Sequence, residues 1–185
     1  MKERGSFPSR APANSQNRFL FVGNGSYLNR GCEAILRGTV KILRATFGPC
    51  QFVNANFDVT DPPFAPTESD PDVVHRPLAP VRKMTARWMA AQTADRLCPA
   101  LGRCLRFGAL REELLKSKLV LSIGGDNYTL DYGIPWMYVN LDRYILASGR
   151  PLVLWGASVG PFDREAEFGR MIHRHLRREI TAVFV

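Results

Sequence analysis

Residues 116–133 read KSKLVLSIGGDNYTLDYG, in which a short apolar segment leads directly into two glycines, an aspartate and an asparagine. The apolar part, residues 118–123, has the length and the β-branched content of a buried strand. Glycine has no Cβ, so a loop that contains it can adopt positive φ and bring its backbone N–H groups close to a ligand. The stretch therefore predicts a strand of a parallel sheet that ends at a ligand-binding loop.

The segments on either side of this strand predict an α/β fold with a parallel sheet. Residues 18–23 (RFLFVG) and 50–58 (CQFVNANFD) are typical of buried strands, and apolar residues recur with helical spacing over residues 32–47 between them. A strand, a helix and a second strand in this order favour parallel pairing. Downstream we expect the same alternation, with a helix at 135–147, a strand at 151–160, a helix at 163–178 and a strand at 180–185.

Two regions do not fit this alternation. Residues 58–80 contain six prolines, which exclude a helix or a central strand and indicate a surface connection. Residues 81–116 are predicted to be helical in two pieces that break near Cys98 and Pro99. Residues 1–17 lack the apolar core of a secretory signal and are expected to form a disordered leader. Their Arg, Ser and Pro content leaves an organellar transit segment as the alternative.

The sequence stops within its last expected strand, at residues 180–185. A strand without a following loop cannot complete a site at the edge of an α/β sheet. We therefore expect residues 18–185 to be one truncated, Rossmann-like lobe of a longer protein, and we expect this lobe to be inactive on its own.

The 185 residues carry a formal net charge of +8, with a pI near 9.7, which favours an anionic partner. The positive charge is scattered over the expected helices without an aromatic platform, so nucleic acid is not expected as that partner. No segment approaches the roughly 20 apolar residues of a membrane span. We expect a cytoplasmic protein, and contact of its basic helices with the inner face of a membrane stays open as an alternative to a solvated surface.

The cysteines and histidines do not predict a metal site. The four cysteines show no CxxC spacing, and the three histidines form no pattern with them. Buried free thiols in a reducing compartment are the expected state of the cysteines. His173 and His175 diverge on a helix, which predicts surface positions for both, and His75 receives no role.

Three glycine-rich loops, at residues 23–31, 124–133 and 156–161, follow expected strands and should meet at one edge of the sheet. The first loop opens a helix, whose free N–H groups and dipole favour an anion such as phosphate or carboxylate. Tight turns are the alternative reason for these glycines. Neither a dinucleotide motif nor a P-loop fits, because Leu28 stands at the third glycine position and no Lys-Ser or Lys-Thr pair follows.

Three blocks together resemble the N-terminal half of the polysaccharide pyruvyl transferase family: NRGCEAILRGTV at 29–40, LVLSIGGDNY at 119–128 and RPLVLWGASVGPFD at 150–163. The resemblance implies transfer of the enolpyruvyl unit of phosphoenolpyruvate onto two hydroxyls of a sugar or polysaccharide. The products are a cyclic pyruvate ketal and phosphate, and no further cofactor is implied. The resemblance also implies two Rossmann-like lobes across a cleft, as in the GT-B class of glycosyltransferases, with this chain as the first lobe and a C-terminal lobe as its partner.

The resemblance also implies roles for individual residues. Asp126 is the candidate catalytic residue, as a base or as a contact of acceptor hydroxyls, with turn formation as an equal alternative. Cys32 stands where many members of the family have Asp, and Glu33 is interpreted as compensating the helix dipole. The candidate substrate-binding residues are Asn29, Gly31, Gly124, Gly125, Asn127, Ser158 and Gly160. Among them, Asn29 and the N–H groups around Gly31 would hold an anion at the start of the helix.

Two other functions remain open at this point. A sugar-nucleotide glycosyltransferase of the two-lobed type would bind its donor mostly through the second lobe, so the first lobe does not distinguish it. A non-catalytic module that recognises an acidic glycan is the alternative from a different class.

Overall fold

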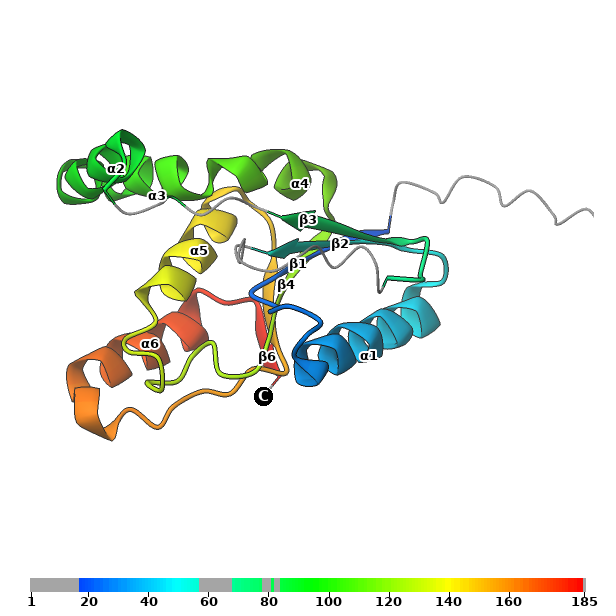
Figure 1. The fold of residues 1–185 in the computed structure, drawn as a ribbon. Coiled ribbons are helices and arrows are strands. Elements are labelled where there is room, and N and C mark those ends of the chain that lie inside the picture. The colour runs from blue at the N-terminus through cyan, green and yellow to red at the C-terminus, as the bar shows by residue number, and fades with distance from the viewer. Residues whose placement is uncertain (1–16, 57–67, 78–80, 82–83, 185) are drawn as a thin grey trace, which may run out of the picture.

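The computed structural model describes residues 17–56, 68–77, 81 and 84–184 (Figure 1). Except for Asn17, the predicted leader lies outside the described residues, as do residues 57–67 of the proline-rich segment. The elements are β1 Arg18–Val22, α1 Arg30–Phe47, β2 Gln51–Asn56, β3 Val73–Pro77, α2 Ala86–Leu97, α3 Pro99–Phe107, the 3-10 turn η1 Gly108–Leu110, α4 Arg111–Lys116, β4 Leu119–Ile123, α5 Trp136–Ala147, β5 Leu152–Trp155, the 3-10 turn η2 Asp163–Glu165, α6 Ala166–Arg178 and β6 Ala182–Phe184.

The strands of the described residues form one parallel sheet in the order β3-β2-β1-β4-β5-β6. This is the strand order of a Rossmann-like fold, so the predicted fold class is confirmed. The strand order reverses between β1 and β4, and ligands of open α/β sheets bind at such a point, beyond the carboxyl ends of the strands. A second lobe stays a prediction.

Alternate residues of the central strands serve the two faces of the sheet, as the period of a strand requires. On one face, Phe19 and Phe21 of β1 pack with Leu36 of α1. On the other face, Leu20 and Val22 belong to a core that also contains apolar residues of α5 and α6. Figure 1 shows α1 on one side of the sheet and α4 on the other.

Strand β3 lies inside the segment for which the sequence predicts a surface connection. It pairs with β2 alone, so it is an edge strand. An edge strand tolerates proline, because its outer side needs no N–H donor, and Pro77 stands at the end of β3 opposite Asn56. The prolines correctly excluded a central strand, but the interpretation as a connection without a strand is wrong for residues 73–77.

The predicted break of the helical region is confirmed, because α2 ends at Leu97 and α3 begins at Pro99. A third helical piece, α4, precedes β4. The cysteines are free, but Cys98 and Cys104 are exposed and Cys50 is buried. The prediction of buried thiols is therefore wrong for Cys98, which stands between α2 and α3, and for Cys104 of α3.

None of the described helices is both long and apolar enough to cross a membrane. Among the described residues, no three His, Cys, Asp or Glu side chains are gathered in an arrangement that could hold a metal ion. Contact of the basic helices with a membrane surface stays a prediction.

Candidate active site

A groove of about 640 Å³ opens between the loops that follow β1 and β4, where the strand order reverses. We call residues 23–29 the first groove loop and residues 124–133 the second groove loop. The start of α1 and the start of α5 complete the groove. Its lining residues are Gly23, Asn24, Gly25, Asn29, Gly31, Cys32, Ile35, Asn56, Gly124, Gly125, Asp126, Asn127, Thr129, Tyr132, Gly133, Ile134, Pro135, Met137 and Tyr138.

Two glycines let the groove loops pack against each other. Gly23 has a φ of +83° and Gly124 a φ of +145°, in the region that residues with side chains disfavour. A Cβ on Gly124 would lie 2.4 Å from Nδ2 of Asn127 and 2.8 Å from the carbonyl oxygen of Gly23. At Gly124, the groups that approach closely are therefore the protein's own Asn127 and Gly23, whereas a Cβ on Gly125 would meet open space.

Asn127 joins the two groove loops. Its Nδ2 donates to the carbonyl oxygen of Gly23 at 2.9 Å and to that of Ile123 at 3.3 Å. Gly23 directly follows β1 and Ile123 ends β4, so this amide fixes the spacing of the two loops where they leave the sheet. Asn127 thus lies in the groove as expected, with its amide nitrogen bonded within the protein.

Asp126 lines the groove with an exposed side chain. Its carbonyl oxygen accepts hydrogen bonds from the Thr129 N–H at 3.4 Å and from the Thr129 hydroxyl at 3.1 Å. No described residue forms a hydrogen bond or ion pair with the carboxylate of Asp126. Turn formation therefore uses the backbone of Asp126 and leaves its carboxylate available to a ligand.

Asn29 caps the amino end of α1 and lines the groove together with Gly31. Its Oδ1 accepts the Gly31 N–H at 2.9 Å, so this N–H of the predicted anion site is already bonded. Glu33 lies in the first turn of α1 and pairs with Arg37 and Arg30 at 2.9 and 2.8 Å. Hydrogen bonds from these arginines lower the pKa of Glu33, in keeping with its interpretation as a charge at the helix start.

Asn24 is a groove residue that the sequence interpretation missed. Its side chain is buried, and its Nδ2 donates to the carbonyl oxygen of Cys32 at 3.2 Å. Its Oδ1 is buried and has no hydrogen-bond partner among the described residues. A buried acceptor without a donor is costly, so this oxygen suits an ordered water, and a ligand hydroxyl would reach it only after a small shift of the loop. The signal available in the sequence was its position between Gly23 and Gly25.

The loop after β5 borders the second groove loop and does not line the groove. The Ser158 N–H donates to the carbonyl oxygen of Gly125 at 2.7 Å, and the Gly160 N–H donates to that of Tyr128 at 3.0 Å. Tyr128 also forms a parallel bridge with Val159. Ser158 and Gly160 are thus brought next to the other candidate residues, but they lie outside the lining of the groove.

The groove combines oxygen acceptors with apolar side chains. Of the described residues that line it, none is Lys or Arg, and Asp126 is the one acid. Tyr132, Ile134 and Met137 line it with exposed side chains. Such a lining suits a neutral ligand that carries hydroxyl groups, because acceptors take hydroxyl protons and apolar side chains pack against its carbon faces.

A buried cluster, which we call the first anchor, holds Tyr27 of the first groove loop. The Tyr27 hydroxyl donates to Oε2 of Glu68 at 2.8 Å, and Nε2 of His75 lies 3.1 Å from the same oxygen. Nδ2 of Asn54 lies 3.2 Å from Nδ1 of His75, so the ring accepts on that side. Arg37 bonds the other oxygen of Glu68 at 3.3 Å and compensates its charge.

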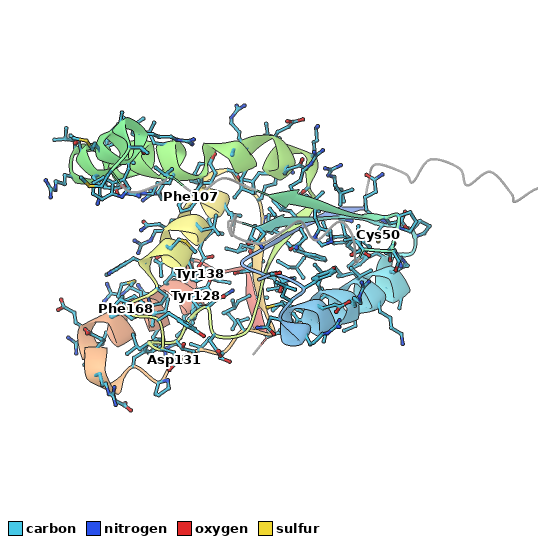
Figure 2. All side chains as sticks on the ribbon, viewed as in Figure 1. Cys50, Phe107, Tyr128, Asp131, Tyr138 and Phe168 are labelled. Carbon is cyan, nitrogen blue, oxygen red and sulfur yellow. The ribbon has the colours of Figure 1, made fainter. Side chains whose placement is uncertain are left out.

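A second anchor of Tyr128, Asp142, His175 and Glu179 holds the second groove loop; Figure 2 labels Tyr128 among the side chains. The Tyr128 hydroxyl lies 2.9 and 2.8 Å from the two carboxylate oxygens of Asp142. Nε2 of His175 lies 3.0 Å from Asp142, and Nδ1 lies 2.8 Å from Glu179. Burial raises the pKa of Tyr128, so its hydroxyl stays protonated and donates.

The prediction of a surface position for His175 is wrong, because its side chain is fully buried. Phe168, Ile172 and His175 recur with helical spacing on the buried side of α6, whereas His173 is exposed. That spacing was the signal in the sequence. Asp142 gave a similar signal, since it stands among the apolar residues of α5.

The two anchors shift the pKa values of their histidines in opposite directions. Burial lowers the pKa of His75 and outweighs the hydrogen bond to Glu68. Burial also acts to lower the pKa of His175, but the hydrogen bonds and charges of Asp142 and Glu179 outweigh it, so the pKa of His175 is raised. At a pH between these two pKa values, His75 is therefore neutral while His175 is protonated.

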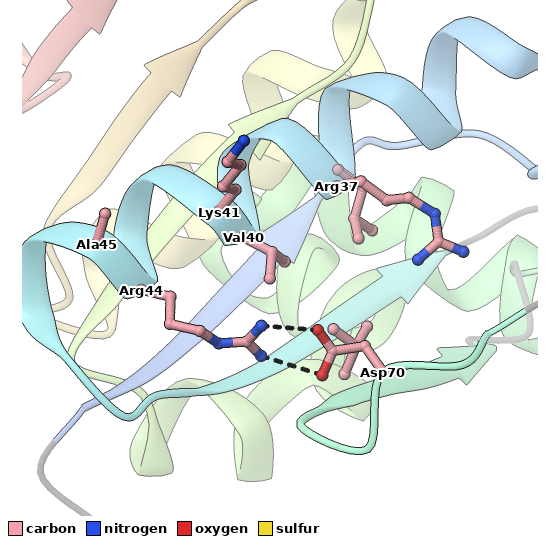
Figure 3. A pocket seen from close by; sticks show the side chains of 8 residues that line it. Arg37, Val40, Lys41, Arg44, Ala45 and Asp70 are labelled. Atoms are coloured by element: carbon pink, nitrogen blue, oxygen red, sulfur yellow. Dashed lines mark hydrogen bonds and ion pairs between the residues drawn. The ribbon is translucent and has the colours of Figure 1, made fainter.

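A second hollow, of about 330 Å³, lies between α1 and the start of β3. Figure 3 shows Arg44 reaching Asp70, with bonds of 2.9 and 3.0 Å, and Arg44 also bonds Asp72 at 3.1 Å. Arg37, at the other end of the hollow, bonds two carboxylates. Because both arginines are engaged, the hollow is a poorer candidate for an anion site than its basic lining suggests.

Comparisons with known proteins identify the family. The model of a family described as polysaccharide pyruvyl transferase matches residues 29–185. No curated protein gave a match. Among solved structures, the chain is similar to UGT2 of Phytolacca americana complexed with UDP-2fluoro-glucose and pterostilbene, with a TM-score of 0.45 and 15% identity over 76% of this chain and 30% of that one. Because the family match spans most of its length, the chain belongs to the polysaccharide pyruvyl transferase family.

Proposed function

We propose that this chain is part of an enzyme that transfers the enolpyruvyl unit of phosphoenolpyruvate to two hydroxyls of a sugar or polysaccharide. Family membership supports pyruvyl transfer in general. The observation that carries the finer proposal is the groove, where the carboxylate of Asp126 is exposed without a partner among the described residues and no described lining residue is cationic.

The proposed reaction balances without a redox cofactor. The methylene carbon of the enolpyruvyl group takes a proton, and the neighbouring carbon bonds to one sugar oxygen. The second sugar oxygen then bonds to the same carbon and displaces phosphate. Each hydroxyl loses its proton, one proton ends in the new methyl group, and the carboxylate of Asp126 would accept a hydroxyl proton as a general base.

The groove would hold the acceptor sugar in this proposal. Phosphoenolpyruvate carries a carboxylate and a phosphate, which proteins bind with Lys, Arg or free N–H groups. The described lining has no Lys or Arg, and the Gly31 N–H is bonded to Asn29. The cations for the donor would therefore come from outside the groove lining. We expect residues 18–185 alone to be inactive because a crevice with a single wall forms no closed pocket that excludes water.

The other candidate residues would act mainly through the shape of the groove. Gly125 leaves open space beside Asp126, while Gly124 and Asn127 fix the distance between the groove loops. Ser158 and Gly160 would act indirectly, by holding the second groove loop through its backbone.

The test is Asp126→Asn in the full-length protein, measured as phosphate release that requires both phosphoenolpyruvate and a sugar acceptor. Loss of a general base lowers turnover by about 10²- to 10⁴-fold. Asp163→Asn is the matched control, because Asp163 is an exposed acid outside the groove lining. We expect this control to keep wild-type turnover.

Unchanged turnover of Asp126→Asn would remove Asp126 from the mechanism. Complete absence of phosphate release by the wild-type protein, with every acceptor tried, would favour the alternatives instead. A sugar-nucleotide glycosyltransferase would be stabilised by nucleotide sugars in a thermal-shift assay, and a glycan-binding module would bind its glycan saturably without releasing phosphate.

A further inference from the structure

We propose that His175 is a positioning residue of the groove: its protonated ring holds Asp142, and Asp142 holds Tyr128 and with it the second groove loop. The three residues come from different elements, since Asp142 belongs to α5 and His175 to α6. The inference concerns the shape of the groove and does not depend on the identity of the ligand.

The geometry calls for protons on both ring nitrogens of His175. Nε2 faces a carboxylate oxygen of Asp142 at 3.0 Å, and Nδ1 faces one of Glu179 at 2.8 Å. A neutral imidazole has one N–H and one lone pair, so one of these contacts would oppose a lone pair to a carboxylate oxygen. The imidazolium form satisfies both contacts.

The groups around the ring make Asp142 dependent on this charge. Asp142 and His175 are both buried, whereas the Glu179 side chain is 39% exposed. Burial raises the pKa of Asp142, and the hydrogen bond and charge of His175 oppose that rise, so the ionised form of Asp142 depends on His175. Nε of Arg143 lies 3.7 Å from Glu179, so this second cation near the ring pairs with the partly exposed carboxylate of Glu179. The remaining titratable group, the Tyr128 hydroxyl, donates to Asp142 without adding positive charge.

Tyr128 connects the buried Asp142 and His175 to the second groove loop. Its hydroxyl lies 3.2 Å from Oγ of Ser122 in β4, and its carbonyl oxygen accepts the Gly160 N–H. The two residues before it are Asn127, which joins the groove loops, and Asp126, whose carboxylate is available in the groove. Release of Tyr128 would therefore loosen the segment that carries both of them.

Deprotonation of His175 would leave the buried carboxylate of Asp142 without a cation. An unpaired buried charge is strongly unfavourable, so the cluster would open or take up water. The groove should be well formed while His175 is protonated, and it should loosen as the pH rises through the pKa of His175.

The test is an NMR titration of the full-length protein, with ¹³C-labelled histidine side chains and ¹⁵N-labelled backbone. We expect the Cε1 resonance of His175 to titrate with a midpoint above pH 6.5, the ordinary value for histidine. The amide resonances of Gly124, Gly125 and Asp126 should shift with the same midpoint. A midpoint at or below 6.5, or groove amides that do not follow His175, would overturn the proposal.

A conservative variant sharpens this test and leaves the buried pair of Asp142 and His175 intact. Glu179→Gln removes the partly exposed carboxylate, which should lower the midpoint of His175 by about one pH unit and move the groove amides with it. His173→Gln, which changes an exposed ring on the same helix, should leave both midpoints unchanged. If Glu179→Gln moves His175 while the groove amides keep the wild-type midpoint, those amides report another group and the link is disproved.

Activity supplies a second readout, separable from the first. In the wild-type protein, kcat/KM for phosphate release should fall as the pH rises through the same midpoint, and Glu179→Gln should move that fall to lower pH. Absence of phosphate release would count against the proposed function alone, because the coupled NMR titration decides the role of His175 without a substrate.

Discussion

The two groove loops are held by the same three kinds of side chain, but the charge of each anchor is compensated differently. Each loop places a tyrosine hydroxyl on a buried carboxylate, and each carboxylate also contacts a histidine. At Glu68, the arginine Arg37 supplies the positive charge. At Asp142, the positive charge comes from His175.

The difference follows from the partner of the second ring nitrogen. His75 has an amide nitrogen, that of Asn54, at its Nδ1, so no second carboxylate opposes the burial that lowers the pKa of its ring. His175 has the carboxylate of Glu179 there, which favours the imidazolium. A guanidinium stays charged at any pH that a protein tolerates, whereas an imidazolium does not. One anchor is therefore compensated permanently, and the other only while its histidine is protonated.

The first prediction, with the largest expected effect, compares loss of the two histidines. His175→Ala leaves Asp142 as an uncompensated buried charge and should lower the free energy of unfolding by about 3–5 kcal/mol. His75→Ala opens a cavity of similar size but leaves Glu68 bonded to Arg37 and Tyr27, so it should cost clearly less. Urea unfolding of the two variants measures the difference.

A second substitution controls for the cavity. Adding Asp142→Asn to His175→Ala removes the buried charge and should restore part of the lost stability, as neighbouring sites that interact are not additive. Equal losses for the two histidine variants, together with no recovery in the double variant, would show that charge compensation does not distinguish the anchors.

The second prediction compares the two tyrosines. Tyr128→Phe removes a hydroxyl from a buried carboxylate and should cost about 1.5–3 kcal/mol, the range of hydrogen bonds to charged groups. Tyr27→Phe should cost less, because Glu68 keeps Arg37 and the N–H of Asp70 at 2.8 Å. Thermal unfolding of both variants checks this order, and a larger loss for Tyr27→Phe would reverse it.

The third prediction, with the smallest expected effect, concerns pH. The raised pKa of His175 contributes stability that is complete below pH 6.5 and lost as the pH rises through that raised pKa. The lowered pKa of His75 contributes stability that is present above pH 6.5 and lost as the pH falls through that lowered pKa. The two anchors should therefore weaken at opposite ends of the neutral range.

Unfolding free energies of glutamine variants across this range separate the two effects. His175→Gln should flatten the decline on the alkaline side, and His75→Gln should flatten part of the decline on the acidic side. An alkaline decline that persists unchanged in His175→Gln would mean that another group causes it.

Elements with a strong local pattern could be predicted from the sequence. The apolar segment at 118–123 became β4, Leu119–Ile123, and the break near Cys98 and Pro99 separates α2 from α3. Strand β3 was missed because its position at the edge of the sheet, where proline is tolerated, is not a local property. The sequence identified Asp126 as a loop residue beyond a strand. Only the structure showed that the turn uses the carbonyl oxygen of Asp126 and leaves its carboxylate available.

The sequence by itself determined the alternation of strands and helices, the glycine loops beyond the strands and the blocks that carry the family resemblance, because each of these is written in neighbouring residues. Tertiary structure alone decided that Asn127 clamps Gly23 and that His175 meets Asp142 and Tyr128. Those contacts depend on which strands pair and which helix faces are buried together. The physical reason is that periodicity fixes the face of an element, whereas the packing of the whole sheet selects the partner that the face meets.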